Sequence, residues 1–487
     1  MIIPQKKNPT NLIISMACVL ALAICILPMR AYSATHKQIE NLTLETPGGE
    51  QFTLRTLHYS YPNNRFVSLR DLASGLIGTS KHFDVAVSSN KIAIRTGRDY
   101  VPVGGENTPF EETEYTSDGI RINEITIDDR DCRYYTMMGN NSEGSRDAFI
   151  NITDIAMILN ADFKMDPSSG KLIMSDGDFR VDIDEYIDQG LYSEVYSAIV
   201  GDAATGTVFT AYNESVSVCA ASTTKLMTYL CIMDAVSAGE ISLDDEVTIS
   251  AEAAALSMTS DGVIKMKEGQ KAILGDLLYG MLLPSSNEAS LALAEHLDGT
   301  EDVFVQRMNN KARELGLSEA TIFYNCNGLP EYSDTVAASK IQNHISANDM
   351  FVLSSHIINK YPEIKDITTT TKYHMDAFSM DVENTNPLLY NLPGTVGLKT
   401  GTTKASGASL IAAYDVKDET GIHTVIAIEY GAEDASARNT VCEILMRYGI
   451  QCMEDFDLSA VPEFDAEFPD TASKLLRRIV TIRSASR

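Results

Sequence analysis

Residues 222–225 read Ser-Thr-Thr-Lys and open a largely apolar run that Gly239 ends. The run predicts a helix over residues 222–238, because glycine commonly ends helices. A serine and a lysine three residues apart in a helix lie on one face, one turn from each other. A serine hydroxyl becomes a good nucleophile only when a base removes its proton, and a lysine with a lowered pKa can be that base. Ser222 and Lys225 are therefore a candidate nucleophile and base.

This spacing alone is not specific, because the chain contains it twice more. Ser88 and Lys91 are three residues apart, and so are Ser168 and Lys171. Both pairs fall in turns between predicted strands, where no helix aligns the two side chains. We interpret them as turn residues.

The segments around residue 222 predict an antiparallel sheet interrupted by helices. Strands are expected at residues 198–200, 207–209, 396–400, 409–414 and 424–430, and helices at residues 277–283, 288–297 and 437–448. Pro284 separates the first two of these helices, which suits a loop between them. Strands on both sides of a helical middle predict a sheet subdomain packed on a helical one, with a cleft between.

Two further motifs follow Ser222 in order. Ser285-Ser286-Asn287 falls in the predicted loop between helices, and Lys399-Thr400-Gly401 falls on the first of the three late strands. Each motif alone would be a loop cap or a strand end. Together they bring hydroxyl, amine and amide groups from three separate elements toward one candidate site.

On these three motifs, residues 185–455 resemble the low-molecular-mass penicillin-binding proteins, the serine-type D-alanyl-D-alanine carboxypeptidases. Residues 277–283 and 323–329, and Gly397-Leu398, add to the similarity. The resemblance implies an α/β (α+β) fold of the penicillin-binding-protein and β-lactamase-like transpeptidase type, an antiparallel sheet plus a helical subdomain. It implies no cofactor and no metal.

The resemblance also implies roles for the first two motifs. Ser222 would form an acyl-enzyme with the penultimate D-alanine carbonyl, and Lys225 would act as its general base. Ser285 would relay a proton to the leaving D-alanine amine, while Asn287 would position the substrate amide and the lysine. Ser286 stands where the carboxypeptidases commonly have glycine, and we expect it to face outward.

For the third motif, the resemblance implies substrate binding. Lys399 would supply positive charge that helps to keep Lys225 neutral, and Thr400 and Thr402 would bind the substrate carboxylate. Gly401 would let the substrate pair with the strand edge. Backbone N–H groups of Ser222 and Thr402 would form the oxyanion hole.

The N-terminal part contains an internal repeat, because residues 66–73 match residues 149–156 and residues 83–94 match residues 163–174. Each unit predicts a short helix followed by two strands joined by a turn. The two units predict a small α+β module over residues 34–181, ahead of a catalytic domain over residues 182–455. This module resembles the copper amine oxidase N-terminal-like domain, although nothing in it looks like a copper site.

The N-terminal residues suggest export, and the C-terminal residues allow contact with a membrane surface. Lys6 and Lys7, the apolar residues 12–27 and the small residues near Ser33 predict a signal peptide over residues 1–33. A retained membrane anchor is the alternative, and Cys25 leaves lipidation open. The tail, residues 456–487, turns basic after Asp470 and is either a membrane-surface helix or a solvated terminus.

The net charge limits which partners the protein can bind, and the cysteine spacing indicates the state of the thiols. The formal net charge of -28 disfavours nucleic acid. Six of the eight cysteines follow the signal, without metal-ligand spacing, and we expect buried free thiols rather than a disulfide between Cys442 and Cys452. The expected partners are peptidoglycan stem peptides and, as covalent inhibitors, β-lactam antibiotics.

The leading hypothesis is a D,D-carboxypeptidase that trims stem pentapeptides. A D,D-endopeptidase acts on the same bond type and stays open. A β-lactamase would need an added carboxylate for its deacylating water, and no segment between Asn287 and Lys399 resembles the loop that carries it. A wall-binding protein without turnover is the last alternative, disfavoured by the intact motifs.

Overall fold

The computed structural model describes residues 38–58, 65–88, 91–109, 116–140, 146–188, 190–332, 340–417 and 421–455. The predicted signal peptide and the tail after residue 455 lie outside these residues. The chain divides into Met1–Gln38 and Ile39–Arg487, and the second unit carries the features described below. In the described ranges, we find no helix long and apolar enough to cross a membrane.

The N-terminal module is built on one sheet with the described strand order β4-β5-β6-β7-β8-β3-β2-β1-β10-β9. Its strands are β1 (Gln38–Glu45), β2 (Gln51–His58), β3 (Arg65–Ser68), β4 (Phe83–Val87), β5 (Ile92–Thr96), β6 (Thr116–Ile127), β7 (Arg130–Asn140), β8 (Arg146–Asn151), β9 (Phe163–Asp166) and β10 (Lys171–Met174). A core of its own includes Leu54, Leu72, Ile94 and Ile150.

The repeat is visible in the module. Each unit has the predicted helix and hairpin, α2 (Leu69–Gly75) with β4 and β5, and α3 (Ile152–Leu159) with β9 and β10. Each also begins with a strand that was not predicted, and these strands, β3 and β8, pair antiparallel. The side chains of Ser68 and Asn151 accept hydrogen bonds from the first turns of their helices, which fixes where both helices begin.

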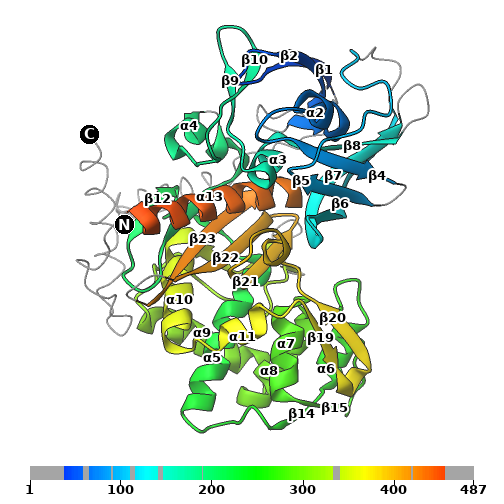
Figure 1. The fold of residues 1–487 in the computed structure, drawn as a ribbon. Coiled ribbons are helices and arrows are strands. Elements are labelled where there is room, and N and C mark those ends of the chain that lie inside the picture. Colours follow the sequence, from blue (N-terminus) through cyan, green and yellow to red (C-terminus); the bar gives the residue numbers. More distant parts are fainter. Residues whose placement is uncertain are drawn as a thin grey trace, which may run out of the picture. The chain divides into compact units, whose positions relative to one another are not determined.

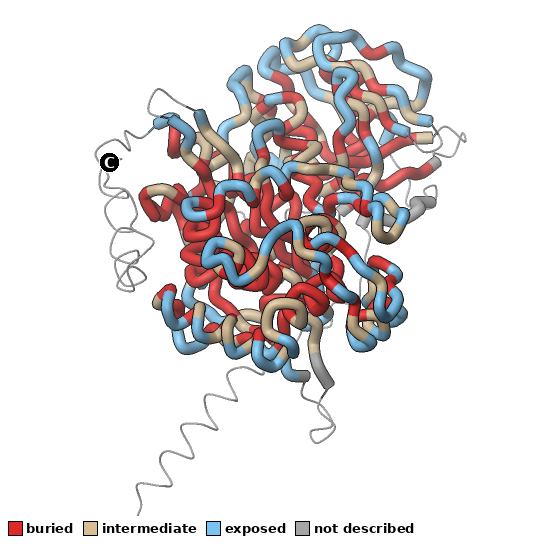
Figure 2. Tube along the Cα trace, turned by 90° about the horizontal axis from the view of Figure 1, so that it is seen from below, coloured by how far each residue is buried: buried red, intermediate tan, exposed pale blue. Residues whose placement is uncertain are grey.

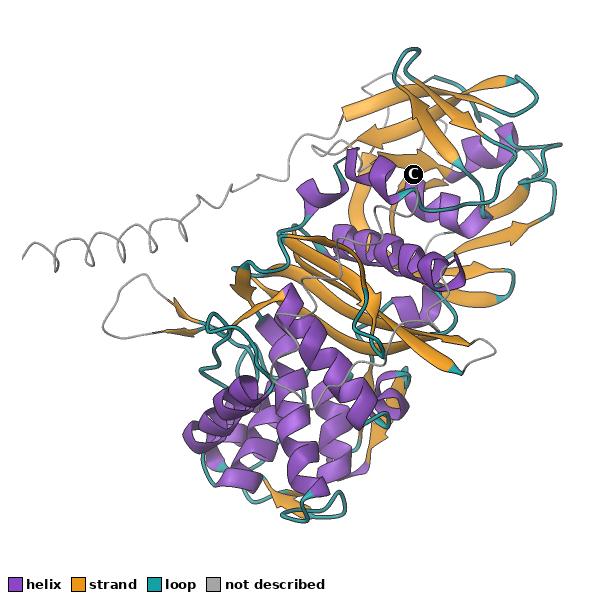
Figure 3. Cartoon of the chain, turned by 90° about the vertical axis from the view of Figure 1, so that its left-hand side faces the viewer, coloured by secondary structure: helices purple, strands orange, loops and turns teal. Residues whose placement is uncertain are grey.

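The second sheet has the described order β12-β11-β23-β22-β21 and antiparallel pairing throughout. Its strands are β11 (Ser197–Asp202), β12 (Val208–Tyr212), β21 (Thr395–Thr403), β22 (Gly407–Lys417) and β23 (Ile422–Ala432). All five strands predicted in this region are confirmed. Alternate residues of β22 face different cores: Ile411 packs with the helical region, and Leu410 packs with α13 (Ala435–Asp455). Figures 1 and 3 show helices on both faces of this sheet.

The helical region lies between β12 and β21 in the sequence. Its helices are α5 (Lys225–Ser237), α6 (Ala251–Ser257), α7 (Leu274–Leu282), α8 (Asn287–Asp298), α9 (Glu301–Glu314), α10 (Ala347–Lys360), α11 (Ile364–Thr368) and α12 (Leu388–Asn391). The short strands are β13 (Ser217–Cys219), β14 (Glu246–Thr248), β15 (Lys271–Ile273), β16 (Glu331–Tyr332), β17 (Lys340–Ile341), β18 (His344–Ser346), β19 (Lys372–Met375) and β20 (Met380–Glu383). The linker after the module contains α4 (Ile183–Asp188).

Helix α5 is the centre of this region. Residues 225–233 of α5 are all buried, so the helix is enclosed on every side. Buried residues fill the interior of the described chain, and exposed ones follow the loops and outer helix faces (Figure 2). The six cysteines after residue 37 are free, and all but the partly buried Cys219 are buried, which confirms the expected thiols.

Candidate active site

Ser222 lies in a tight turn, where an α-helix was predicted to begin. The segment Ala221–Thr224 is a 3-10 helix, and α5 begins only at Lys225. The hydroxyl of Thr223 donates to the carbonyl of Ala220 at 2.6 Å and also lies 3.0 Å from the Tyr430 hydroxyl. This side-chain bond competes with helical bonding and favours the tighter turn. Ser222 itself remains partly exposed.

Lys225 connects the turn to the second motif. Its fully buried Nζ lies 3.1 Å from Oγ of Ser222, 2.8 Å from Oδ1 of Asn287 and 2.7 Å from the carbonyl oxygen of Asn327. Burial disfavours the charged ammonium and lowers the pKa of Lys225 to about 7. Near neutral pH the amine is therefore partly unprotonated, as a base requires.

The Ser285–Asn287 loop connects α7 to α8. Asn287 is the first residue of α8; its Nδ2 donates to the carbonyl of Asp261 at 2.9 Å, which aims Oδ1 at Lys225. Ser285 has a left-handed φ of 68°, and within the described ranges its buried Oγ has no hydrogen-bond partner. The expected outward position of Ser286 is wrong. Ser286 is buried and its Oγ caps α8 by accepting from the backbone N–H of Ala289.

The third motif lies on β21, an edge strand of the sheet in the described order. Gly401 faces the Ser222 turn: a Cβ at this position would lie 3.1 Å from Cγ2 of Thr223. Thr400 is buried and its Oγ1 lies 2.6 Å from Oγ1 of Thr385. Thr402 is exposed, with its hydroxyl bonded to the Gly401 carbonyl at 2.7 Å.

Lys399 is the second buried lysine of the site. Its Nζ donates to the Thr400 carbonyl at 2.9 Å. Burial, together with the positive charges of Lys225 and Arg438, holds its pKa well below the usual range. For Lys225, by contrast, burial is the main cause of the lowered pKa, so the expected effect of Lys399 on Lys225 is at most secondary.

A family model described as D-alanyl-D-alanine carboxypeptidase matches residues 190–429, which include all three motifs. This part of the chain belongs to that family. We call residues 190–429 the carboxypeptidase domain.

Named relatives agree with this assignment. The chain is 33% identical over 252 residues to the D-alanyl-D-alanine carboxypeptidase DacF of Bacillus subtilis, covering 51% of this chain and 60% of DacF. It is 34% identical over 260 residues to DacD of Escherichia coli, covering 52% of this chain and 63% of DacD. The chain thus spans less than two thirds of these relatives. A solved structure, penicillin-binding protein D2 from Listeria monocytogenes in an ampicillin-bound form, is 29% identical and covers 53% of this chain and 97% of that one, with a TM-score of 0.44.

The carboxypeptidase domain also contains site residues that were not predicted. The carbonyl of Asn327 accepts from Lys225, and a Cβ on Gly328, whose φ is +89°, would lie 1.8 Å from the carbonyl oxygen of Ala221. The side chain of Asn343 donates to Thr224 and to the carbonyl of Asn325. The similarity at residues 323–329 was a signal for this segment, but it did not indicate that main-chain atoms make the contacts.

The turn at Ser168 was interpreted correctly. It joins β9 to β10, and the hydroxyls of Ser168 and Ser169 donate to Asp166. Residues 89 and 90 of the other turn lie outside the described residues.

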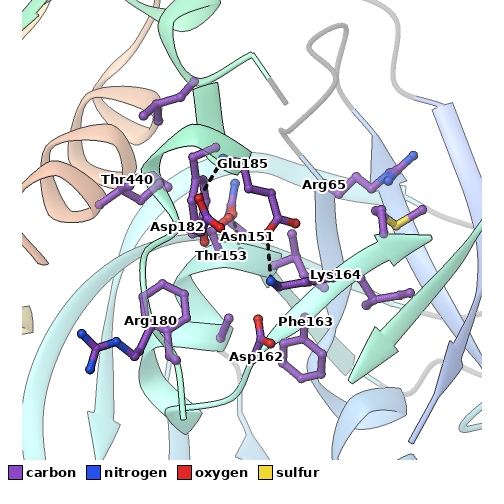
Figure 4. Close-up of a pocket in the computed structure, with 18 of the residues that line it drawn as sticks. Arg65, Asn151, Thr153, Asp162, Phe163, Lys164, Arg180, Asp182, Glu185 and Thr440 are labelled. Atoms are coloured by element: carbon purple, nitrogen blue, oxygen red, sulfur yellow. Dashed lines mark hydrogen bonds and ion pairs between the residues drawn. The ribbon is translucent and has the colours of Figure 1, made fainter. Parts of the chain in front are cut away.

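A separate pocket of about 90 Å³ lies between the module, the linker and α13, and contains no predicted site residue (Figure 4). Lys164 and Glu185 form an ion pair of 2.9 Å at this pocket. Among the described residues, no group of three or more His, Cys, Asp or Glu side chains is placed to hold a metal ion.

Proposed function

We propose that this protein is a serine-type D-alanyl-D-alanine carboxypeptidase, which removes the terminal D-alanine from peptidoglycan stem pentapeptides. The observation that carries the proposal is the 3.1 Å contact between Nζ of Lys225 and Oγ of Ser222, with the lysine buried and its pKa lowered to about 7. A neutral amine in hydrogen-bond contact with a hydroxyl is the arrangement that activates a serine nucleophile.

In the acylation step, the Ser222 hydroxyl attacks the carbonyl of the penultimate D-alanine and its proton passes to Lys225. The tetrahedral intermediate then collapses, the C–N bond breaks, and the terminal D-alanine leaves with a proton relayed by Ser285. Within the described ranges the buried Oγ of Ser285 has no hydrogen-bond partner, and Ser285 lies two residues before Asn287, which contacts Lys225. A hydroxyl that is available at this place supports the relay. Water then hydrolyses the ester and regenerates Ser222.

Substrate binding is proposed along the outer edge of β21. The Gly401 position admits no large side chain beside Thr223, so a peptide backbone approaches the strand there. The hydroxyls of Thr400 and Thr402 supply donors for the substrate carboxylate, and Lys399 supplies positive charge in its protonated form, which a bound carboxylate favours. Backbone N–H groups of Ser222 and Thr402 form the oxyanion hole in this proposal, and such donors are worth about 3 kcal/mol each.

The remaining parts of the chain have proposed roles of their own. Residues 34–181 are proposed as an accessory module similar to the copper amine oxidase N-terminal-like domain, and residues 182–455 as the catalytic domain. Residues 1–33 are proposed to direct export, which would bring the enzyme to peptidoglycan. Contact of residues 456–487 with a membrane surface is part of the same proposal.

The test is covalent labelling by a fluorescent penicillin, followed by mass spectrometry of a stem pentapeptide. We expect a stable label, its loss in Ser222→Ala, and release of one alanine from the peptide. Labelling that survives Ser222→Ala would overturn the mechanism. Cleavage of a cross-linked stem-peptide dimer in preference to the pentapeptide would identify an endopeptidase, rapid loss of the penicillin label a β-lactamase, and an unchanged peptide a binding protein.

A further inference from the structure

The module contacts the carboxypeptidase domain through Asn391, at the end of α12. The backbone N–H of Arg133 in β7 donates to Oδ1 of Asn391 at 2.8 Å, and Nδ2 of Asn391 donates back to the Arg133 carbonyl at 2.9 Å. A single side-chain amide thus pairs with both main-chain groups of one residue. Asn391 is 4% exposed, so both bonds are shielded from water.

Two arginines strengthen this contact. The Arg133 guanidinium lies 4.1 Å from the centre of the Tyr390 ring and 3.3 Å from the Glu383 carboxylate. Arg130 donates to the carbonyl oxygens of Tyr390 and Asn391 at 3.1 and 3.3 Å. The module therefore holds both ends of residues 383–391, which we call the bracing segment.

The middle of the bracing segment reaches the candidate site. The backbone N–H of Thr385 donates to the Leu283 carbonyl at 3.2 Å, two residues before Ser285. Its Oγ1 lies 2.6 Å from Oγ1 of Thr400. Asn386 donates to the carbonyl of Gly397 in β21 at 3.0 Å. One short segment thus contacts both the second-motif loop and the third-motif strand.

Thr385 is exposed, so its own burial does not secure its position. Its position depends instead on its backbone bond to Leu283, on the bonds of its buried neighbours Asn384 and Asn386, and on the ends of the segment, which the module contacts. The contact with Thr385 restricts rotation of the Thr400 hydroxyl. Because the hydroxyl is already oriented, it loses less entropy when it binds a carboxylate.

We propose that Thr385 and Asn391 are positioning residues: Asn391 fixes the bracing segment to the module, and Thr385 orients the Thr400 hydroxyl for the substrate carboxylate. The proposal rests on the function proposed above, because it assigns Thr400 to substrate binding. In this proposal the module contributes to substrate binding through Arg133, a residue of β7 that lies outside the residues matched by the family model.

The test is steady-state kinetics of D-alanine release from a stem pentapeptide by the full chain. Thr385→Val should raise KM about threefold to tenfold, the effect of one neutral hydrogen bond, with kcat changed less than about twofold. Thr385→Ser keeps the hydroxyl and should restore the KM. Asn391→Ala should raise KM in the same way, by about threefold to thirtyfold.

Thr440→Val is the matched control, because it removes another bond of the module, the 3.1 Å contact between Asp154 and Thr440 of α13, which does not involve the bracing segment. It should leave KM unchanged. Because both changes act on Thr400, the double variant of Thr385→Val and Asn391→Ala should be no worse than the more impaired single variant. Arg133→Ala tests the same connection if Asn391→Ala does not fold, and should also raise KM.

A wild-type KM in Asn391→Ala, or additive effects in the double variant, would overturn the proposal. So would an equal rise of KM in Thr440→Val, since the effect would then come from general loosening of the module. Failure of the proposed function would instead appear as peptide left intact by the wild-type protein, or as labelling that persists in Ser222→Ala.

Discussion

The side chains of Lys225 and Ser222 meet at 3.1 Å although the turn that carries Ser222 is a 3-10 helix and Lys225 is the first residue of α5. The contact therefore does not depend on regular α-helical spacing. It depends on Asn287 and Asn327, which accept hydrogen bonds from the same Nζ and hold it in a buried position. The protonation state of this buried amine should therefore control how fast Ser222 is acylated.

The rate of acylation should rise with pH. Lys225 accepts the Ser222 proton only when its amine is neutral, and the neutral fraction grows as pH rises through its pKa of about 7. We expect the second-order rate constant for fluorescent penicillin to increase about tenfold for each pH unit below 7 and to level off above it. A rate that is constant from pH 5.5 to 8.5 would show that another group is the base.

Asn287→Asp should move this pH dependence to higher pH. The new carboxylate would lie about as close to Nζ of Lys225 as the present Oδ1, at 2.8 Å, and would favour the ammonium form. The rising limb should shift upward by about one to three pH units, so that acylation at pH 7 falls at least about fivefold. Asn310→Asp, on the exposed side of α9, adds the same charge elsewhere and should leave the profile in place. An unshifted profile in Asn287→Asp would contradict the assigned contact.

Gly328→Ala should disrupt the Ser222 turn. The added Cβ would overlap the carbonyl oxygen of Ala221, and the left-handed φ of +89° adds strain. We expect at least a tenfold loss of penicillin acylation. Gly239→Ala is the matched control, because φ is +73° and the added Cβ meets nothing within 4 Å. It should cost only the backbone strain, about 1–2 kcal/mol, and acylate normally. Equal acylation by the two variants would show that the Gly328 contact is unimportant.

Much of the carboxypeptidase domain was predictable from the sequence, since its strands and helices follow local patterns. The strands of the late sheet are nearly continuous apolar runs, as buried strands are, and Pro284 marks the loop between α7 and α8. The three motifs indicated the site because their order is information that single motifs lack. The repeat predicted both helices of the module, because the two copies show the same pattern and each supports the interpretation of the other.

Other features depend on contacts that local sequence does not encode. Asn327 binds Lys225 through a main-chain carbonyl, and any residue type has one. Ser286 was expected to face outward, but it caps a helix that lies in the interior. Asn391 and Arg133 are 258 residues apart, so only the folded chain shows their pairing. The contact between the hydroxyls of Thr385 and Thr400 is likewise visible only in the folded chain.

The last prediction concerns Asp154 in α3, a buried carboxyl between the module and α13. It is 4% exposed, accepts a hydrogen bond from Thr440 at 3.1 Å, and burial raises its pKa well above the ordinary range, with a further contribution from Glu443. Above the ordinary carboxyl pKa the unfolded chain loses this proton while the folded chain keeps it. The free energy of unfolding therefore falls as pH rises between the unfolded and folded pKa values of Asp154.

Asp154→Asn should remove this loss, because an amide does not ionise and its Oδ1 can still accept from Thr440. We expect the stability of the variant relative to the wild type to be greater at pH 8 than at pH 5, because only the wild type has a carboxyl whose ionisation opposes folding. Thermal unfolding of both proteins at the two pH values measures the difference. Asp176→Asn, at an exposed position, removes the same charge and should show no such pH dependence. A stability relative to the wild type that falls from pH 5 to pH 8 would mean that the folded protein binds Asp154 as the carboxylate, with Arg447 as its compensating charge.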